Sequence, residues 1–175
     1  MSSNLKVGNK LKLTVISAVF GALLFAVQVA LGFLPNIELI TTLLMVFGAV
    51  CGKYTFISVY VFVAAEGLMY GFNLWWIGYL YVWLIPVFAG ILMKNCNNIL
   101  FHTVFAALFG LLFGVLTCPA ELIFGKQAAL AYIIAGIPFD VMHCIANGIL
   151  TLILYLPLKK ALEKAMAKIK KEGSI

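Results

Sequence analysis

Asp140, His143 and Asn147 interrupt the apolar stretch Ala135–Leu158, which otherwise has the composition of a membrane span. Their spacing of three and then four residues places them on one face of a helix. Three polar side chains on one buried face need partners, because hydrocarbon offers no hydrogen bonds. Two interpretations fit: they satisfy one another and the backbone freed by Pro138, or they form the polar floor of a binding pocket.

The remaining acidic residues before the C-terminal tail are Glu38, Glu66 and Glu121. A carboxylate inside a bilayer costs about 2.5–3.5 kcal/mol on insertion scales, so Glu38 and Glu66 are expected to face a cavity or a partner. Glu121 falls in a loop, where water can solvate it.

Catalysis is not expected from this pattern. The chain has no GxSxG, HExxH or GxxxxGK[ST] motif, and its four cysteines fit no zinc spacing. We therefore predict no catalytic residues, no metal and no cofactor, and we expect that the protein is not an enzyme.

Composition indicates an integral membrane protein. Of the 175 residues, 65% are hydrophobic and 10% are charged. Soluble domains are less apolar and carry far more charge, with about 25% of their residues charged. The predicted fold class is all-α, with one transmembrane domain at residues 1–158 and a lysine-rich cytoplasmic tail at 159–175.

Gly, Pro, Asn and Lys residues divide the chain into six apolar segments, which predict about six transmembrane helices. They are Leu13–Leu34, Ile37–Cys51, Tyr54–Tyr70, Trp75–Met93, Ile99–Thr117 and Ala128–Leu158.

The lysines orient these segments. If the N-terminus is cytoplasmic, eleven of the twelve lysines lie inside and Lys126 alone lies outside. The positive-inside rule therefore predicts that both termini are cytoplasmic. The net charge of +6 is explained by this topology, and no nucleic-acid partner is expected. The lipid bilayer is the expected surrounding, and the tail is interpreted either as an amphipathic helix that contacts anionic lipid or as a solvated helix end.

The same topology gathers aromatic residues at the outer ends of the third and fourth segments: Tyr70, Phe72, Trp75, Trp76, Tyr79 and Tyr81. An interfacial aromatic belt explains such a cluster. A stacking surface for a flat ligand explains it equally, and it also accounts for all three tryptophans falling within nine positions.

The chain resembles the substrate-binding S component of energy-coupling factor (ECF) transporters, the vitamin-importing branch of the ABC transporters. The stretches Pro35–Trp83 and Gly136–Leu162 carry the resemblance best. The small-residue pair Ala18-x-x-x-Ala22 also matches the family's AxxxA motif. Alanines four residues apart let another helix approach closely, although ordinary packing inside the bundle explains them equally well.

The resemblance implies a subunit of the bacterial plasma membrane that captures a small vitamin at the outer face. Its partners would be the transmembrane T component, which docks at Ala18 and Ala22, and two cytosolic ATPases. The lid would be Gly32–Glu38. The expected substrate-binding residues are Glu38, Glu66, Tyr70, Asn73, Trp76, Tyr79, Asp140, His143 and Asn147.

The candidate ligands are a pyridoxine-type molecule, cobalamin or cobinamide, a pyrimidine, a flavin or a pterin. A rival hypothesis is a self-contained proton- or cation-coupled carrier or channel that uses Glu38, Glu66 and Asp140. A membrane scaffold without a ligand is a third, weaker hypothesis.

Overall fold

The computed structural model describes residues 2–34 and 37–172, with side chains from residue 10 to residue 169. The described chain is all-helical, as predicted, and contains no strand. Its elements are α1 (Ser2–Leu31), α2 (Ile40–Cys51), η1 (Gly52–Tyr54), α3 (Thr55–Tyr70), α4 (Leu74–Val82), α5 (Leu84–Leu92), α6 (Ile99–Leu111), α7 (Phe113–Thr117), η2 (Cys118–Phe124) and α8 (Lys126–Glu172).

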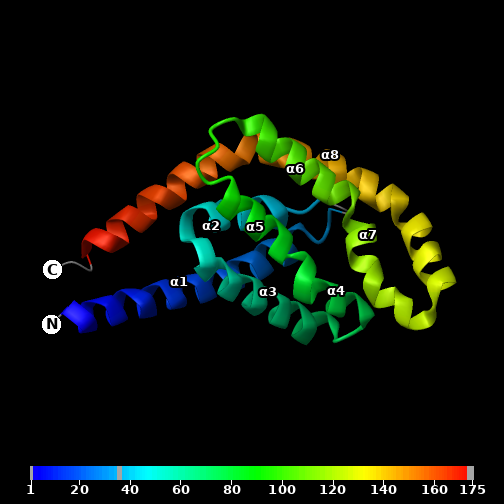
Figure 1. Cartoon of the computed structure of the whole chain (residues 1–175), viewed down its shortest axis with the longest axis horizontal. Coiled ribbons are helices and arrows are strands. Elements are labelled where there is room, and N and C mark those ends of the chain that lie inside the picture. The colour runs from blue at the N-terminus through cyan, green and yellow to red at the C-terminus, as the bar shows by residue number, and fades with distance from the viewer. Residues whose placement is uncertain (1, 35–36, 173–175) are drawn as a thin grey trace.

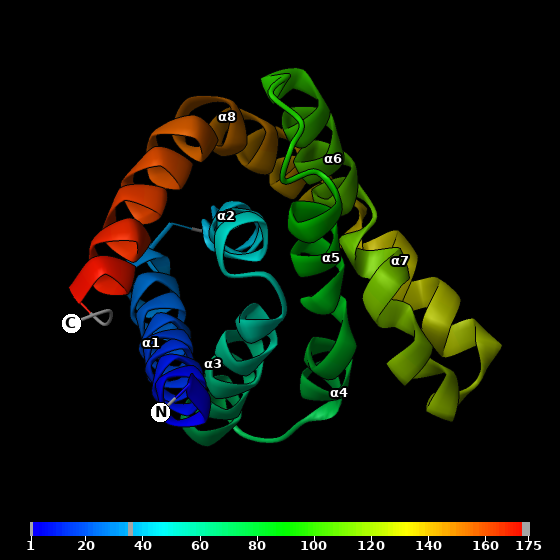
Figure 2. The same cartoon turned by 60° about the vertical axis from the view of Figure 1, so that its left-hand side comes forward.

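Helix α2 forms the centre of the molecule. Figure 2 shows it end-on between α1, α3, α5 and α8, and its residues from Ile40 to Gly48 are all buried. Its twelve residues span only about 18 Å, less than the ~30 Å of a hydrocarbon core. The protein buries this short helix from Ile40 to Gly48, whereas its last residues, Ala49 to Cys51, are half-buried.

Glycines with positive φ lie at the ends of three helices. Gly52 (φ 58°) follows α2, Gly71 (φ 90°) follows α3 and Gly125 (φ 99°) precedes α8. An L-residue with a side chain is strained in this conformation, so glycine permits the turn. The turn at Gly52 reverses the chain, so that α3 runs back along the direction from which α2 came (Figures 1 and 2). The sequence-based boundaries at Gly52 and Gly71 are confirmed. The fifth segment, predicted to end at Thr117, instead continues as η2 to Phe124, just before Gly125.

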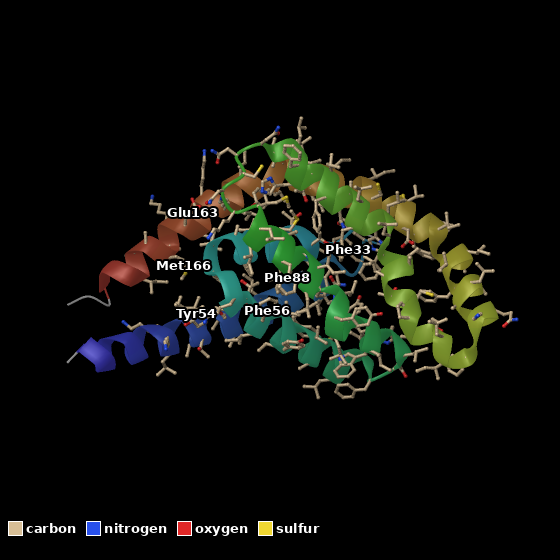
Figure 3. All side chains as sticks on the ribbon, in the orientation of Figure 1. Phe33, Tyr54, Phe56, Phe88, Glu163 and Met166 are labelled. Atoms are coloured by element: carbon tan, nitrogen blue, oxygen red, sulfur yellow. The ribbon has the colours of Figure 1, made fainter. Side chains whose placement is uncertain are left out.

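The other helices pack in pairs around α2. The most extensive contacts join α1 with α3, α2 with α5, and α6 with α8. Between α3 and α5, the rings of Phe56 and Phe88 contact each other at a centroid distance of 5.2 Å (Figure 3). Both chain ends lie on the same side of the molecule (Figure 1).

Four helical stretches of the described chain are long and apolar enough to cross a membrane: Lys10–Leu31, Ile40–Tyr70, Leu74–Leu92 and Lys126–Ile169. The pair Ile99–Leu111 and Phe113–Phe124, bent by 61°, makes a fifth if it is one span. The structure thus has four to five such stretches where the sequence predicts six, because α2 and α3 pass this length criterion only when taken together.

Helix α8 is continuous through Pro138 and Pro157, so the helix does not open at Pro138. It curves along its length instead (Figure 1), as helices that contain proline do. The tail predicted at 159–175 is helical to Glu172 and extends α8 without a break. Lys159 fixes the start of this extension, because its Nζ donates to the Lys94 carbonyl at 2.7 Å.

The close approach of α2 and α5 generates a prediction about stability. A Cβ atom at Gly90 would collide with the backbone carbonyl of Met45, which cannot rotate away. We expect Gly90→Ala to destabilise the protein by about 1–3 kcal/mol, seen as a lower midpoint of thermal unfolding in detergent.

Gly148→Ala is the matched control, because its new methyl group would meet only the Ala107 Cβ at an ordinary 3.5 Å. It gains helix propensity without a collision and should leave the midpoint unchanged or raise it. Equal losses in the two variants would contradict the close α2–α5 packing.

Candidate functional site

A chain of hydrogen bonds joins the N-terminal end of α2 to α8. The Asn147 amide donates to Thr41 Oγ1 at 3.3 Å, and the Thr41 hydroxyl donates to Glu38 Oε1. The other oxygen, Glu38 Oε2, accepts from the Thr41 backbone N–H at 2.9 Å, as at a capped helix N-terminus. One turn further along α8, Thr151 shares a second hydrogen bond of 2.8 Å with Thr42. Thr41 therefore links Glu38, at the start of α2, to Asn147 of the last helix.

An enclosed cavity of about 50 Å³ lies beside this chain of hydrogen bonds. Its walls come from five helices and two connecting segments: Gln28 of α1, Glu38, Tyr79 of α4, Trp83, Gly110 of α6, Phe113 of α7, and His143 and Asn147 of α8. Residues distant in sequence thus converge on one small space.

Three polar atoms on residues that line this cavity are buried without a hydrogen-bond partner among the described residues. They are the Trp83 indole Nε1, His143 Nδ1 and Asn147 Oδ1. Such atoms are rare in folded proteins, since each costs roughly 1–3 kcal/mol. Five further atoms of this kind lie on other described residues, so this place is distinguished by having three of them on the walls of one cavity.

Aromatic rings form one side of the cavity. Tyr79 and Trp83 meet almost at right angles with centroids 5.3 Å apart, and Phe113 lies 5.6 Å from Trp83. The His143 ring lies 5.7 Å from Phe113. The cavity therefore combines apolar ring surfaces with a few polar atoms, which is the usual make-up of a small-molecule site.

Asp140 has a different role from its neighbours on α8. Its two carboxylate oxygens both accept from the Gly114 backbone N–H at 3.1 Å. Gly114 lies just after the bend between α6 and α7, where backbone N–H groups lack partners within a helix. A Cβ at Gly114 would stand 2.6 Å from Asp140 Oδ2, so a side chain at this position would displace the Asp140 carboxylate. Asp140 stabilises the bend.

The structure brings together part of the predicted set. Glu38, Tyr79, His143 and Asn147 line the enclosed cavity, whereas Glu66, Tyr70, Asn73, Trp76 and Asp140 do not. Asp140 and His143 line a separate open cleft of about 350 Å³ between α7 and α8, and Phe113 and His143 belong to both spaces.

The predicted residues outside the cavity have other surroundings. Glu66 is buried in α3, and its Oε1 has no hydrogen-bond partner in the described chain. Trp76 fastens α4 to α3, because its indole Nε1 donates to the Val63 carbonyl at 2.8 Å. Tyr70 and Asn73 are exposed.

The predicted lid, Gly32–Glu38, includes residues 35–36, which lie outside the described residues. Phe33 in this segment is 77% exposed (Figure 3). Glu38, at its other end, is buried at the cavity.

Gln28, Trp83, Gly110 and Phe113 line the cavity but were not predicted as site residues. Gln28 had a usable signal, because it is a polar residue inside the first apolar segment. Trp83 was visible as part of the tryptophan cluster. Nothing in the sequence distinguishes Gly110 or Phe113 from the many other glycines and phenylalanines of the chain. Across the described residues, no group of three or more His, Cys, Asp or Glu side chains could hold a metal ion.

Comparisons of the chain with protein-family models, with curated proteins and with solved structures gave no match.

The Asp140–Gly114 contact generates a prediction. Asp140→Ala leaves the Gly114 N–H without its acceptor, and we expect a loss of about 1–3 kcal/mol of stability. Asp140→Asn keeps a carbonyl oxygen at the same place and should retain most of the stability. Thermal unfolding of both variants in detergent measures the difference, and equal losses would show that the hydrogen bond to Gly114 is not what Asp140 contributes.

Proposed function

We propose that this protein is a membrane-embedded capture subunit that binds a small water-soluble vitamin or vitamin precursor at the outer face of the bacterial plasma membrane. It delivers the molecule through an ATP-driven complex of the ECF type. The observation that carries the proposal is the enclosed cavity with three buried, unpartnered polar atoms, among the described residues, on Trp83, His143 and Asn147.

The size of the cavity means that it must widen to admit the ligand. Its volume is about 50 Å³, enough for one or two water molecules, whereas small-molecule sites measure about 300–1,000 Å³. The adjoining cleft is of ligand size, and Phe113 and His143 separate the two spaces. A shift of these two side chains, or of the segment Gly32–Glu38, makes room for a vitamin.

The proposed topology has six crossings with both termini in the cytoplasm. The reversal at Gly52 supports treating α2 and α3 as two crossings, although each is short. With both chain ends on one side, the N-terminal lysines, Lys94 and Lys159 fall on the cytoplasmic face, in agreement with the positive-inside rule. Lys126, at the start of α8, falls on the outer face.

The docking surface for the T component is the alanine face of α1. Ala18 is half-buried and Ala22 is exposed, and Ala26 and Ala30 continue the face and are also exposed. Small side chains on an exposed helix face allow a second helix to approach closely in a membrane.

The rival carrier hypothesis has less support. A relay through Glu38, Glu66 and Asp140 needs a connected path, but Glu38 lines the enclosed cavity, Asp140 lines the open cleft and Glu66 lines neither. Both oxygens of Asp140 also accept a backbone hydrogen bond at the α6–α7 bend.

The first test is a comparison of binding with transport. Purified alone, the protein should bind its vitamin tightly, seen as a co-purified molecule in native mass spectrometry, and should transport nothing in liposomes. Uptake should require the T component and the ATPases. Uptake by the protein alone, with or without a proton gradient, would contradict the proposal.

A second test uses one substitution type at two positions. Trp83→Phe removes an indole N–H at the cavity, and we expect a loss of about tenfold or more in ligand affinity. Trp75→Phe is the control, because Trp75 contacts Tyr79 but does not line the cavity, and it should leave affinity nearly unchanged. Isothermal titration with the co-purified vitamin measures both variants, and equal effects would place the ligand elsewhere.

A third test separates docking from binding. Replacing Ala18 and Ala22 together by Trp should abolish co-purification with the T component, because two large side chains hold the partner helix away. Vitamin binding should be unchanged, since neither residue lines the cavity. A complex that still assembles would place the docking face elsewhere.

A further inference from the structure

We propose that the ligand of the enclosed cavity is a planar nitrogen heterocycle that carries a positive charge. This inference rests on the proposed capture function and names the chemical class of its substrate. Three features of the cavity carry it: the balance of charge, the balance of hydrogen-bond donors and acceptors, and the aromatic walls.

The charge balance comes first. Glu38 is 8% exposed, yet it forms no ion pair within the described part of the chain, and no lysine lines the cavity. The N-terminus of α2 offers only about half a positive charge to this carboxylate. Buried charges are normally paired, so the missing partner is a cation.

The hydrogen-bonding atoms of the cavity walls also favour a nitrogen heterocycle as the ligand. Asn147 Oδ1 is an acceptor without a donor among the described residues, and the Glu38 carboxylate has lone pairs beyond those that Thr41 uses. The Trp83 indole Nε1 is a donor without an acceptor in the same part of the chain. A matching ligand therefore donates through amino or protonated ring nitrogens on one edge and accepts at one further atom. A strongly anionic ligand would add repulsion to a cavity whose described walls contain no lysine.

The aromatic walls suit a cationic ring in particular. Tyr79, Trp83 and Phe113 line the cavity at centroid distances of 5.3 to 6.3 Å from one another. The face of an aromatic ring attracts a cation, most strongly in tryptophan, and the attraction grows when water is excluded. Once the cavity has widened, a flat heterocycle lies against these rings, and its positive charge is shared between them and Glu38.

The experiment uses the full-length protein in lipid nanodiscs. Native mass spectrometry identifies any molecule that co-purifies. Thermal shift and isothermal titration then compare the cations thiamine and 1-methylnicotinamide with the neutral compounds nicotinamide and pyridoxine and the anions pantothenate and biotin. Nicotinamide and 1-methylnicotinamide form a matched pair, because they differ by one N-methyl group and one positive charge.

We expect the co-purified molecule, or the tightest-binding probe, to be a cationic heterocycle. Glu38→Gln should weaken its binding by about tenfold or more, because the variant keeps an acceptor for Thr41 but removes the negative charge. The comparison of probes on the unaltered protein decides the question even if this variant does not fold.

The contrary outcomes separate the two proposals. A neutral or anionic molecule that co-purifies, or that binds more tightly than every cation tested, would overturn the inference and leave the capture function intact. A protein that carries no molecule and responds to none of the probes would overturn the capture function and the inference together.

Discussion

The requirement that every polar group buried in an apolar environment find a partner shapes this molecule. Helix α2 lies at the centre, and two of its residues, Thr41 and Thr42, hydrogen-bond to Asn147 and Thr151 of α8. These contacts hold the last helix against the central one and fix Glu38 at the start of α2. The same requirement explains the Asp140–Gly114 contact, which satisfies a backbone N–H where α6 bends into α7. By contrast, Trp83, His143 and Asn147, which line the enclosed cavity, each have a buried polar atom without a partner among the described residues.

That cavity is built from residues that the fold brings together from distant parts of the chain, from Gln28 to Asn147. The aromatic residues of α4 and α7 and the polar face of α8 meet there beside the N-terminal end of α2, the central helix (Figure 2). In the proposed function, a ligand completes the hydrogen bonds of Trp83, His143 and Asn147. The ligand would also lie against Glu38, which precedes α2 and lines the cavity.

Much of the fold was predictable from the sequence. The apolar composition indicates membrane helices, and glycine is the residue that most readily adopts the positive φ needed at a turn. Gly52, Gly71 and Gly125 all adopt positive φ at turns where the sequence predicts breaks between helices. The continuity of α8 was not predictable, since proline weakens a helix but long apolar helices often tolerate it.

Only part of the site was predictable. Helical spacing placed Asp140, His143 and Asn147 on one face, but it could not show that Asp140 binds a backbone N–H 26 residues earlier. Likewise, the sequence could not show that the Trp76 indole N–H donates to the Val63 carbonyl, a contact that depends on the packing of α4 on α3.

The central claim is that the space bounded by Trp83, His143 and Asn147 is where the ligand binds. A high-resolution structure of the protein with its co-purified molecule tests this claim most directly. We expect the ligand to lie among Tyr79, Trp83 and Phe113, with polar atoms within hydrogen-bond distance of Trp83 Nε1 and Asn147 Oδ1. A ligand confined to the open cleft beside Asp140, or one bound at the outer surface near Tyr70 and Asn73, would contradict the account.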